Sequence, residues 1–231
     1  MAGRILWVVG AYLAGTIPST LVLARLRWNH GGSALVADAR RDTGERDPHI
    51  LMTTRMGAVW SGAAATTDVL KAMVYLLAAR ELGDLSPAWL AACGVVVVLG
   101  HAFPFYAARM SGRGLAAAAG VYLVLLPWEM VLAGVVILIG IALRNSGIAT
   151  TVAMLSVPVV AAVQGQPAAY VAMGAAVFLL IVARRLQGVG AVIRSGVPAR
   201  RAVLFRVVLD TTALPGGGTV AGHRRATPPT S

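Results

Sequence analysis

Seven apolar segments follow one another along most of this chain, and they constrain its fold more than any other feature. A helix needs about 20 mostly apolar residues to cross the roughly 30 Å hydrocarbon core of a bilayer. Of the 231 residues, 58% are hydrophobic and 13% are charged, whereas about 25% of the residues in soluble domains are charged. The sequence therefore predicts an all-α, polytopic membrane helix bundle with segments at residues 5–26, 57–79, 87–107, 115–126, 128–143, 148–163 and 168–183.

The placement of arginine predicts how these segments are oriented. Cytoplasmic connections of membrane proteins carry an excess of Lys and Arg. If the N-terminus lies outside, the outer connections hold only Arg80, accompanied by Glu81 and Asp84. The inner connections then hold Arg25, Arg27, Arg40, Arg41, Arg46, Arg55, Arg109, Arg113 and Arg144. We therefore expect seven crossings of the plasma membrane, an outer N-terminus, a cytoplasmic C-terminus and a functional face toward the cytoplasm.

The chain divides into a membrane domain and a tail. Residues 1–196 contain every apolar segment and form the predicted membrane domain. Residues 197–231 are basic, and from residue 215 they are rich in Gly, Pro and Thr. Such a composition cannot build a packed core. We expect a basic, disordered cytoplasmic tail.

The net charge of +11 points to anionic lipids and phosphate groups rather than to nucleic acid. The basic residues lie at the ends of apolar segments, and aromatic residues do not alternate with them in a stripe on which bases could stack. Cys93 is the single cysteine, so a disulfide framework and a cysteine metal cluster are impossible. His30 and His49 lack the spacing of metal ligands. We expect membrane lipids as partners, no nucleic acid, no metal and no cofactor.

A short turn, Ser111-Gly112-Arg113-Gly114, stands between two apolar segments. Glycine permits backbone conformations in which several N–H groups point toward one anion, and Arg113 offers a planar fork of donors for phosphate oxygens. The next helix is predicted to begin at about Gly114, so the positive end of its dipole is directed at the same place. Two interpretations stay open: a phosphate-binding turn, or a cytoplasmic turn whose arginine follows the positive-inside pattern.

Asp68, Lys71 and His101 are ionisable residues that fall inside apolar segments. Asp68 and Lys71 are three residues apart and therefore share one face of a helix, as a structural ion pair or as one wall of a substrate site. Charged groups at this depth face the bundle interior or a polar cavity. His101 is either a buried histidine bonded to a neighbouring helix or a general base.

Four stretches between residues 8 and 196 carry a resemblance to a known family. These are GTIPSTLVLARL at 15–26, DVLKA at 68–72, GHAFPFYAARMSGRG at 100–114, and Arg144 with the polar break before residue 148. In their residues, order and spacing they resemble the small bacterial membrane acyltransferases that use acyl-phosphate to acylate glycerol 3-phosphate. The G-H-x-F-P pattern followed by a glycine-basic-glycine turn is the most specific of the four.

The resemblance implies a function and a site. The implied reaction moves a fatty acyl group from acyl-phosphate to the sn-1 hydroxyl of glycerol 3-phosphate, giving lysophosphatidate for phospholipid biosynthesis in a bacterial cell membrane. A substrate phosphate oxygen could accept the hydroxyl proton, which would leave a protein base such as His101 unnecessary. The implied phosphate and substrate ligands are Arg113, Ser111, Gly112, Gly114, Arg144, Thr150, Arg185, Asp68 and Lys71.

Some of the family's motifs are altered in this chain. The first cytoplasmic loop carries S-G-N-x-G-x-x-N in the family, whereas this chain has GERDPHIL at residues 44–51. The family's lysine in the glycine turn is Arg113, and the first glycine is Ser111. A serine pair is replaced by Gly147 and Thr150, and the closing R-H-R-E-N keeps one arginine, Arg185. These changes leave an alternative open, a catalytically degenerate homologue that binds lipid phosphate or scaffolds lipid enzymes. A transporter is the third hypothesis, although the chain lacks an evident inverted repeat.

Overall fold

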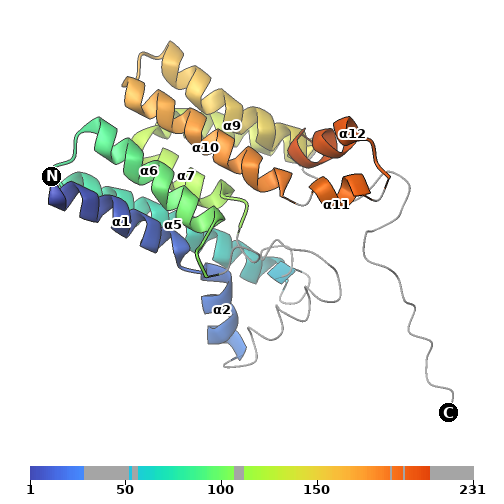
Figure 1. The fold of residues 1–231 in the computed structure, drawn as a ribbon, viewed down its shortest axis with the longest axis horizontal. Helices are drawn as coiled ribbons and strands as arrows, with labels where there is room; N and C mark the ends of the chain where they lie inside the picture. Colours follow the sequence, from blue (N-terminus) through green and yellow to red (C-terminus); the bar gives the residue numbers. More distant parts are fainter. Residues whose placement is uncertain (29–51, 54–56, 107–111, 188, 195, 209–231) are drawn as a thin grey trace.

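The computed structural model describes residues 1–28, 52–53, 57–106, 112–187, 189–194 and 196–208. Within these ranges all regular structure is helical, as the sequence predicts. The long helices lie side by side, with the N-terminus at one end of the bundle and α11 and α12 at the other (Figure 1). The elements are α1 (Ala2–Thr16), α2 (Ser19–Trp28), α5 (Ala58–Leu82), α6 (Pro87–Ala102), α7 (Leu115–Leu125), α8 (Pro127–Ala142), α9 (Ser146–Val163), α10 (Ala168–Leu186), α11 (Val189–Arg194), α12 (Ala199–Val203) and the π-helical turn η1 (Leu204–Val208).

Each predicted apolar segment coincides with a helix or a bent pair of helices. Among the described residues, α5, α9 and α10 are long and apolar enough to cross a bilayer, and α1 with α2 makes a fourth span if the bent pair is counted as one. The apolar helices α6, α7 and α8 are shorter. The molecule is therefore an all-helical membrane bundle over the part of the chain that the structure describes.

The first predicted span, residues 5–26, is not one straight helix. It breaks at Ile17 and Pro18 into α1 and α2, whose axes differ by 45°. The residue before a proline is pushed out of helical conformation, and Ile17 has φ −57° and ψ 118°. The break leaves the Ile17 carbonyl outside any helical ladder, and it accepts a hydrogen bond from Lys71 Nζ at 2.7 Å.

The third predicted span, residues 87–107, also ends early. Helix α6 stops at Ala102, and Phe103 follows with φ −135° and ψ 61°. Phe103 precedes Pro104, so the restriction that breaks the first span also ends this one. His101 therefore lies in the last turn of α6 rather than in the middle of a longer helix.

The tail differs in part from its prediction. Disorder is expected from residue 197, but α12 and η1 are helical, and residues 209–231 lie outside the described part of the chain. Ala202 of α12 packs against Val189 and Val192 of α11. The apolar residues scattered among the arginines thus form a small cluster that holds these short helices together.

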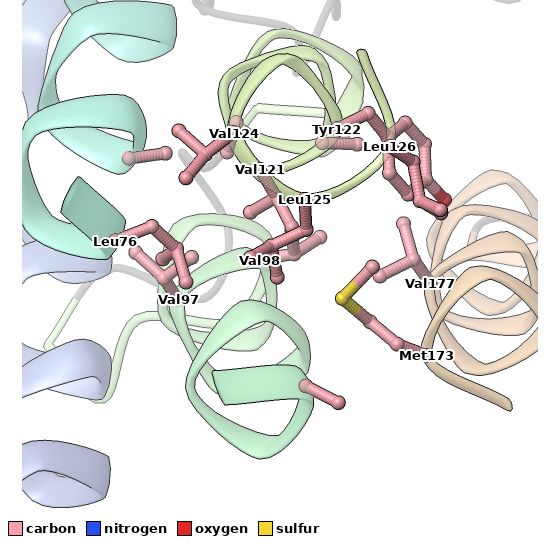
Figure 2. Packing of buried hydrophobic residues seen from close by; sticks show 14 of the residues in the cluster. Leu76, Val97, Val98, Val121, Tyr122, Val124, Leu125, Leu126, Met173 and Val177 are labelled. Carbon is pink, nitrogen blue, oxygen red and sulfur yellow. The ribbon is translucent and has the colours of Figure 1, made fainter. Parts of the chain in front are cut away.

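The main core lies where α5, α6, α7 and α10 meet. Leu76 of α5, Val97 of α6, Val121 of α7 and Met173 of α10 point toward one another (Figure 2) and are fully or almost fully buried. Packing of this kind holds membrane helices together where the hydrophobic effect cannot. The core fixes the relative positions of the helices that carry the buried polar residues.

Helices α1 and α6 approach closely through glycine. A Cβ atom built on Gly100 would lie under 3.0 Å from the Tyr12 carbonyl oxygen, and one built on Gly15 would lie equally close to the Val97 carbonyl oxygen. Small residues permit such contact between backbones. The contact holds the end of α6, which carries His101, against the broken end of α1.

Replacing Gly100 with alanine is therefore expected to destabilise the bundle. The methyl group meets backbone rather than a movable side chain, so α1 and α6 must separate, at a cost of about 1–3 kcal/mol. The thermal unfolding midpoint in detergent would measure this loss. Gly134→Ala in α8 is the matched control, because a Cβ there has no atom within 4 Å. Equal midpoints for the two variants would contradict the expectation.

Candidate active site

An ion pair lies inside the bundle on α5. Asp68 and Lys71 are one helical turn apart, with Lys71 Nζ 2.6 Å from Asp68 Oδ1, and their side chains are 2% and 9% exposed. The shared helix face predicted from their spacing is thus confirmed. A buried pair of this kind needs further hydrogen bonds to offset the desolvation of both charges.

Those further bonds come from α1, α2 and α6. Ser19 Oγ donates to Asp68 Oδ1 at 2.7 Å. Lys71 Nζ donates to the Ile17 carbonyl at 2.7 Å and lies 3.2 Å from His101 Nδ1. We call Ser19, Asp68, Lys71 and His101 the polar cluster. It joins residues from three segments that lie far apart in the sequence.

The other nitrogen of His101 faces the turn that the sequence singles out. A Cβ built on Gly112 would lie under 3.0 Å from His101 Nε2, so the imidazole occupies the space that a side chain at residue 112 would need. Gly112 is buried, and His101 is 8% exposed. His101 therefore connects the polar cluster to the turn Gly112–Gly114, which we call the glycine loop.

The glycine loop leads directly into α7. Gly114 is the N-cap of this helix and has φ +88°, a left-handed conformation that favours glycine. Helix α7 begins at Leu115, as predicted, and its positive dipole end and first N–H groups are directed at the loop. Arg113 is half-buried at this position. Ser111, also predicted to bind phosphate, lies outside the described residues.

Arg184 is a contact residue that sequence reasoning missed. Its Nε donates to the Gly112 carbonyl at 3.3 Å, and its guanidinium carbon lies 5.9 Å from the centroid of the Phe103 ring. The sequence contains two adjacent arginines, Arg184 and Arg185. The family motif pointed to Arg185 and not to Arg184. Neighbouring residues on a helix face different directions, and the described contacts of Arg184 and Arg185 are with different parts of the bundle.

The described contacts of Arg185 are with α9 and the C-terminal segment. Its side chain is buried, and its Nη1 atom donates to Thr151 Oγ1 and to the Val207 carbonyl, both at 2.7 Å. Thr151 also contacts the Val207 and Val208 carbonyls at 3.1 and 3.2 Å. The C-terminal segment therefore accepts hydrogen bonds from a residue that the resemblance assigns to phosphate.

Two other predicted ligands lie near the turn between α8 and α9. Arg144 is exposed and has φ +55°. Thr150 donates to the Ser146 carbonyl of its own helix at 2.6 Å. Direct contacts thus unite Asp68, Lys71, His101 and Gly112. The convergence of Arg144, Thr150 and Arg185 with that group stays a prediction.

Two tyrosines fix the end of α6 against α1. Tyr12 Oη donates to the Phe103 carbonyl at 3.0 Å, and Tyr106 Oη donates to the Thr16 carbonyl. The two bonds therefore tie the segment that follows α6 to α1.

Comparison with known proteins places this arrangement in a family. A family model described as glycerol-3-phosphate acyltransferase matches residues 5–194. A protein of that name from Thioalkalivibrio sulfidiphilus is 37% identical over 124 residues, which are 52% of this chain and 56% of the relative. Another from Geobacter sulfurreducens is 31% identical over 170 residues, covering 72% of this chain and 82% of the relative.

Solved structures agree with the sequence comparison. The crystal structure of PlsY (YgiH), an integral membrane glycerol 3-phosphate acyltransferase, in its glycerol 3-phosphate form has 26% identity and a TM-score of 0.67, covering 83% of this chain and 92% of PlsY. The lysophosphatidic acid form has 25% identity and a TM-score of 0.65, covering 87% and 98%. Because the family model extends over all the long helices and the same bundle recurs in PlsY, this chain belongs to the glycerol-3-phosphate acyltransferase family, the membrane acyltransferases of phospholipid biosynthesis.

Proposed function

We propose that this protein transfers a fatty acyl group from acyl-phosphate to the sn-1 hydroxyl of glycerol 3-phosphate and releases lysophosphatidate and phosphate. The observation that carries the proposal is the buried polar cluster adjoining the glycine loop, in a bundle that matches PlsY. PlsY has been solved in glycerol 3-phosphate and lysophosphatidic acid forms, which correspond to the acceptor and the product of this reaction.

The chemistry requires little covalent help from the protein. The sn-1 oxygen forms a bond to the acyl carbonyl carbon, and the bond between that carbon and the phosphate oxygen breaks. The departing phosphate accepts the hydroxyl proton, so both atoms and charge balance. The protein must hold two anions and align the hydroxyl with the carbonyl. Cations and backbone amides at the glycine loop suit that task.

The residues proposed for phosphate binding surround the start of α7. Arg113 and the amides of Gly112 and Gly114 are the central group, and Arg184 is added to it because it contacts the Gly112 carbonyl. Ser111, Arg144, Thr150 and Arg185 are retained as further ligands. Asp68 and Lys71 support the glycine loop through His101. They therefore serve both as a structural ion pair and as part of the wall of the site.

We place this site at the cytoplasmic face of a bacterial plasma membrane. Seven crossings, an outer N-terminus and a cytoplasmic C-terminus are consistent with the arginine distribution. The end of the bundle opposite the N-terminus carries α11 and α12 (Figure 1), and the glycine loop contacts Arg184 in the last turn of α10. Residues 1–196 are the proposed catalytic membrane domain and residues 197–231 its basic cytoplasmic extension.

A direct assay tests the proposal. The purified protein in detergent is given acyl-phosphate and radiolabelled glycerol 3-phosphate, and lysophosphatidate is separated from the reactants. Acyl-coenzyme A is supplied in a parallel reaction to test the choice of donor. Turnover with acyl-phosphate supports the proposal. Binding of glycerol 3-phosphate without turnover on either donor would favour the degenerate homologue that only binds lipid phosphate.

Arg113→Ala is expected to lower kcat/KM about 10-fold to 100-fold, because a hydrogen bond to a charged group contributes about 1.5–3 kcal/mol. The same assay of lysophosphatidate formation measures this change, and the circular dichroism spectrum checks the fold. Arg4→Ala is the matched control, because Arg4 is an exposed arginine at the start of α1. Activity of Arg113→Ala equal to that of the control would remove Arg113 from the proposed site.

A further inference from the structure

The hydrogen-bond network around Lys71 determines the protonation of its neighbours. Three acceptors surround Nζ: Asp68 Oδ1 at 2.6 Å, the Ile17 carbonyl at 2.7 Å and His101 Nδ1 at 3.2 Å. An ammonium group has three N–H donors and no acceptor. It satisfies all three atoms only if Nδ1 of His101 presents a lone pair to it.

The alternative arrangement conflicts with the same distances. If Nδ1 carried a proton, it would point that proton toward Asp68 Oδ1 at 3.4 Å. Oδ1 already accepts shorter bonds from Ser19 Oγ at 2.7 Å and Lys71 Nζ at 2.6 Å. The Nδ1 proton would also face the Lys71 ammonium, placing two donors against each other. A neutral ring with its proton on Nε2 avoids both conflicts.

We propose that the Asp68–Lys71 pair holds His101 as a neutral imidazole protonated at Nε2, and that His101 positions the glycine loop rather than acting as a general base. This inference rests on the proposed function for its catalytic meaning. Nε2 faces Gly112, and the carbonyl of Gly112 accepts a hydrogen bond from Arg184. The loop is thus fixed between His101 and Arg184.

Among the described residues, few other ionisable groups surround His101. Helix α5 contributes Asp68 and Lys71, and α1 contributes Tyr12, whose hydroxyl bonds to the Phe103 carbonyl next to the end of α6. Arg184 of α10 donates to the Gly112 carbonyl, and Arg113 is next to Gly112 in sequence. Every cation in this group opposes a charge on the imidazole, and Asp68 is already paired with Lys71. A neutral ring that presents its Nδ1 lone pair to Lys71 is the form that fits these neighbouring charges.

Nuclear magnetic resonance of the intact protein in detergent micelles tests the tautomer directly. The four histidines are labelled with ¹⁵N in the ring, and the His101 signals are assigned by their loss in His101→Gln. The expected result at pH 7 is a neutral ring with its proton on Nε2. A proton on Nδ1, or an imidazolium signal, would overturn the proposal.

Activity of two variants tests the positioning role. The amide of glutamine reaches as far as Nε2 and fills the same space beside Gly112, but it cannot act as a base. His101→Gln is therefore expected to stay within about 10-fold of the wild type and to keep its pH profile, whereas His101→Phe loses at least about 100-fold. Equal large losses in both variants, with one limb of the pH profile removed, would assign the base role to His101 instead.

The two proposals can fail separately. If the wild type turns over with neither acyl donor, the proposed function fails, but the tautomer is still read from the spectrum. If the wild type turns over with acyl-phosphate and the spectrum shows a charged or Nδ1-protonated ring, only the inference about His101 fails.

Discussion

Replacing Gly112 with alanine is expected to lower acyltransferase turnover by at least about 100-fold, the loss that a displacement of about 1 Å at a reacting site can produce. The new methyl group would lie under 3.0 Å from His101 Nε2. A histidine free to rotate would move aside at little cost. In this protein Nδ1 is held by Lys71 at 3.2 Å, so either the loop or the polar cluster has to shift.

Steady-state kinetics with acyl-phosphate measure the effect of Gly112→Ala, and the unfolding midpoint shows whether the fold is retained. Gly62→Ala on α5 is the matched control, because it adds the same methyl group where a Cβ has no atom within 4 Å. The double variant Gly112→Ala/His101→Ala relieves the clash but removes the contact, so it is expected to recover stability without recovering turnover. A Gly112→Ala protein as active as Gly62→Ala would show that the loop tolerates displacement.

Replacing Asp68 with alanine is expected to destabilise the protein by about 3–5 kcal/mol, because it leaves the Lys71 ammonium buried without its counter-charge. Lys71 is 9% exposed and Asp68 2%, so water cannot replace the lost partner. Thermal or denaturant unfolding in detergent measures this change.

Two further variants separate the charge effect from simple loss of packing. Glu81→Ala removes a carboxylate from the exposed Arg80–Glu81 pair on the same helix, whose side chains are 44% and 65% exposed. It is expected to cost less than about 1 kcal/mol. Asp68→Leu/Lys71→Met removes both buried charges and is expected to recover most of the stability. A loss for Asp68→Ala as small as that for Glu81→Ala would refute the energetic account of the pair.

Much of the site was accessible from local sequence. The spacing of Asp68 and Lys71 predicted a shared helix face, and the glycine turn predicted a helix beginning near Gly114. Both depend on helix geometry over a few residues, and both agree with the structure. The interpretation of Asp68 and Lys71 as either a structural pair or a wall of the site was left open, because local spacing does not say what lies opposite a helix face.

Other parts of the site depended on which helices touch. Nothing near Lys71 in sequence indicated that it would meet His101, 30 residues away, and Ile17, 54 residues away. The choice between Arg184 and Arg185 depends on how α10 is rotated about its axis, and the family motif alone selected the residue whose described contacts are with α9 and η1.

The amino-acid sequence by itself determined that this chain is a helical membrane protein, approximately where its apolar helices run, and that Asp68, Lys71 and His101 fall inside apolar segments, because hydropathy acts over a few neighbouring residues. The tertiary structure alone decided that the break at Pro18 supplies a carbonyl to Lys71 and that His101 fits against Gly112. These contacts depend on how closely α1, α5 and α6 approach one another and on how each helix is rotated about its own axis. That geometry is set by packing at residues such as Gly100 and by the shared core, where contributions from many distant positions act together.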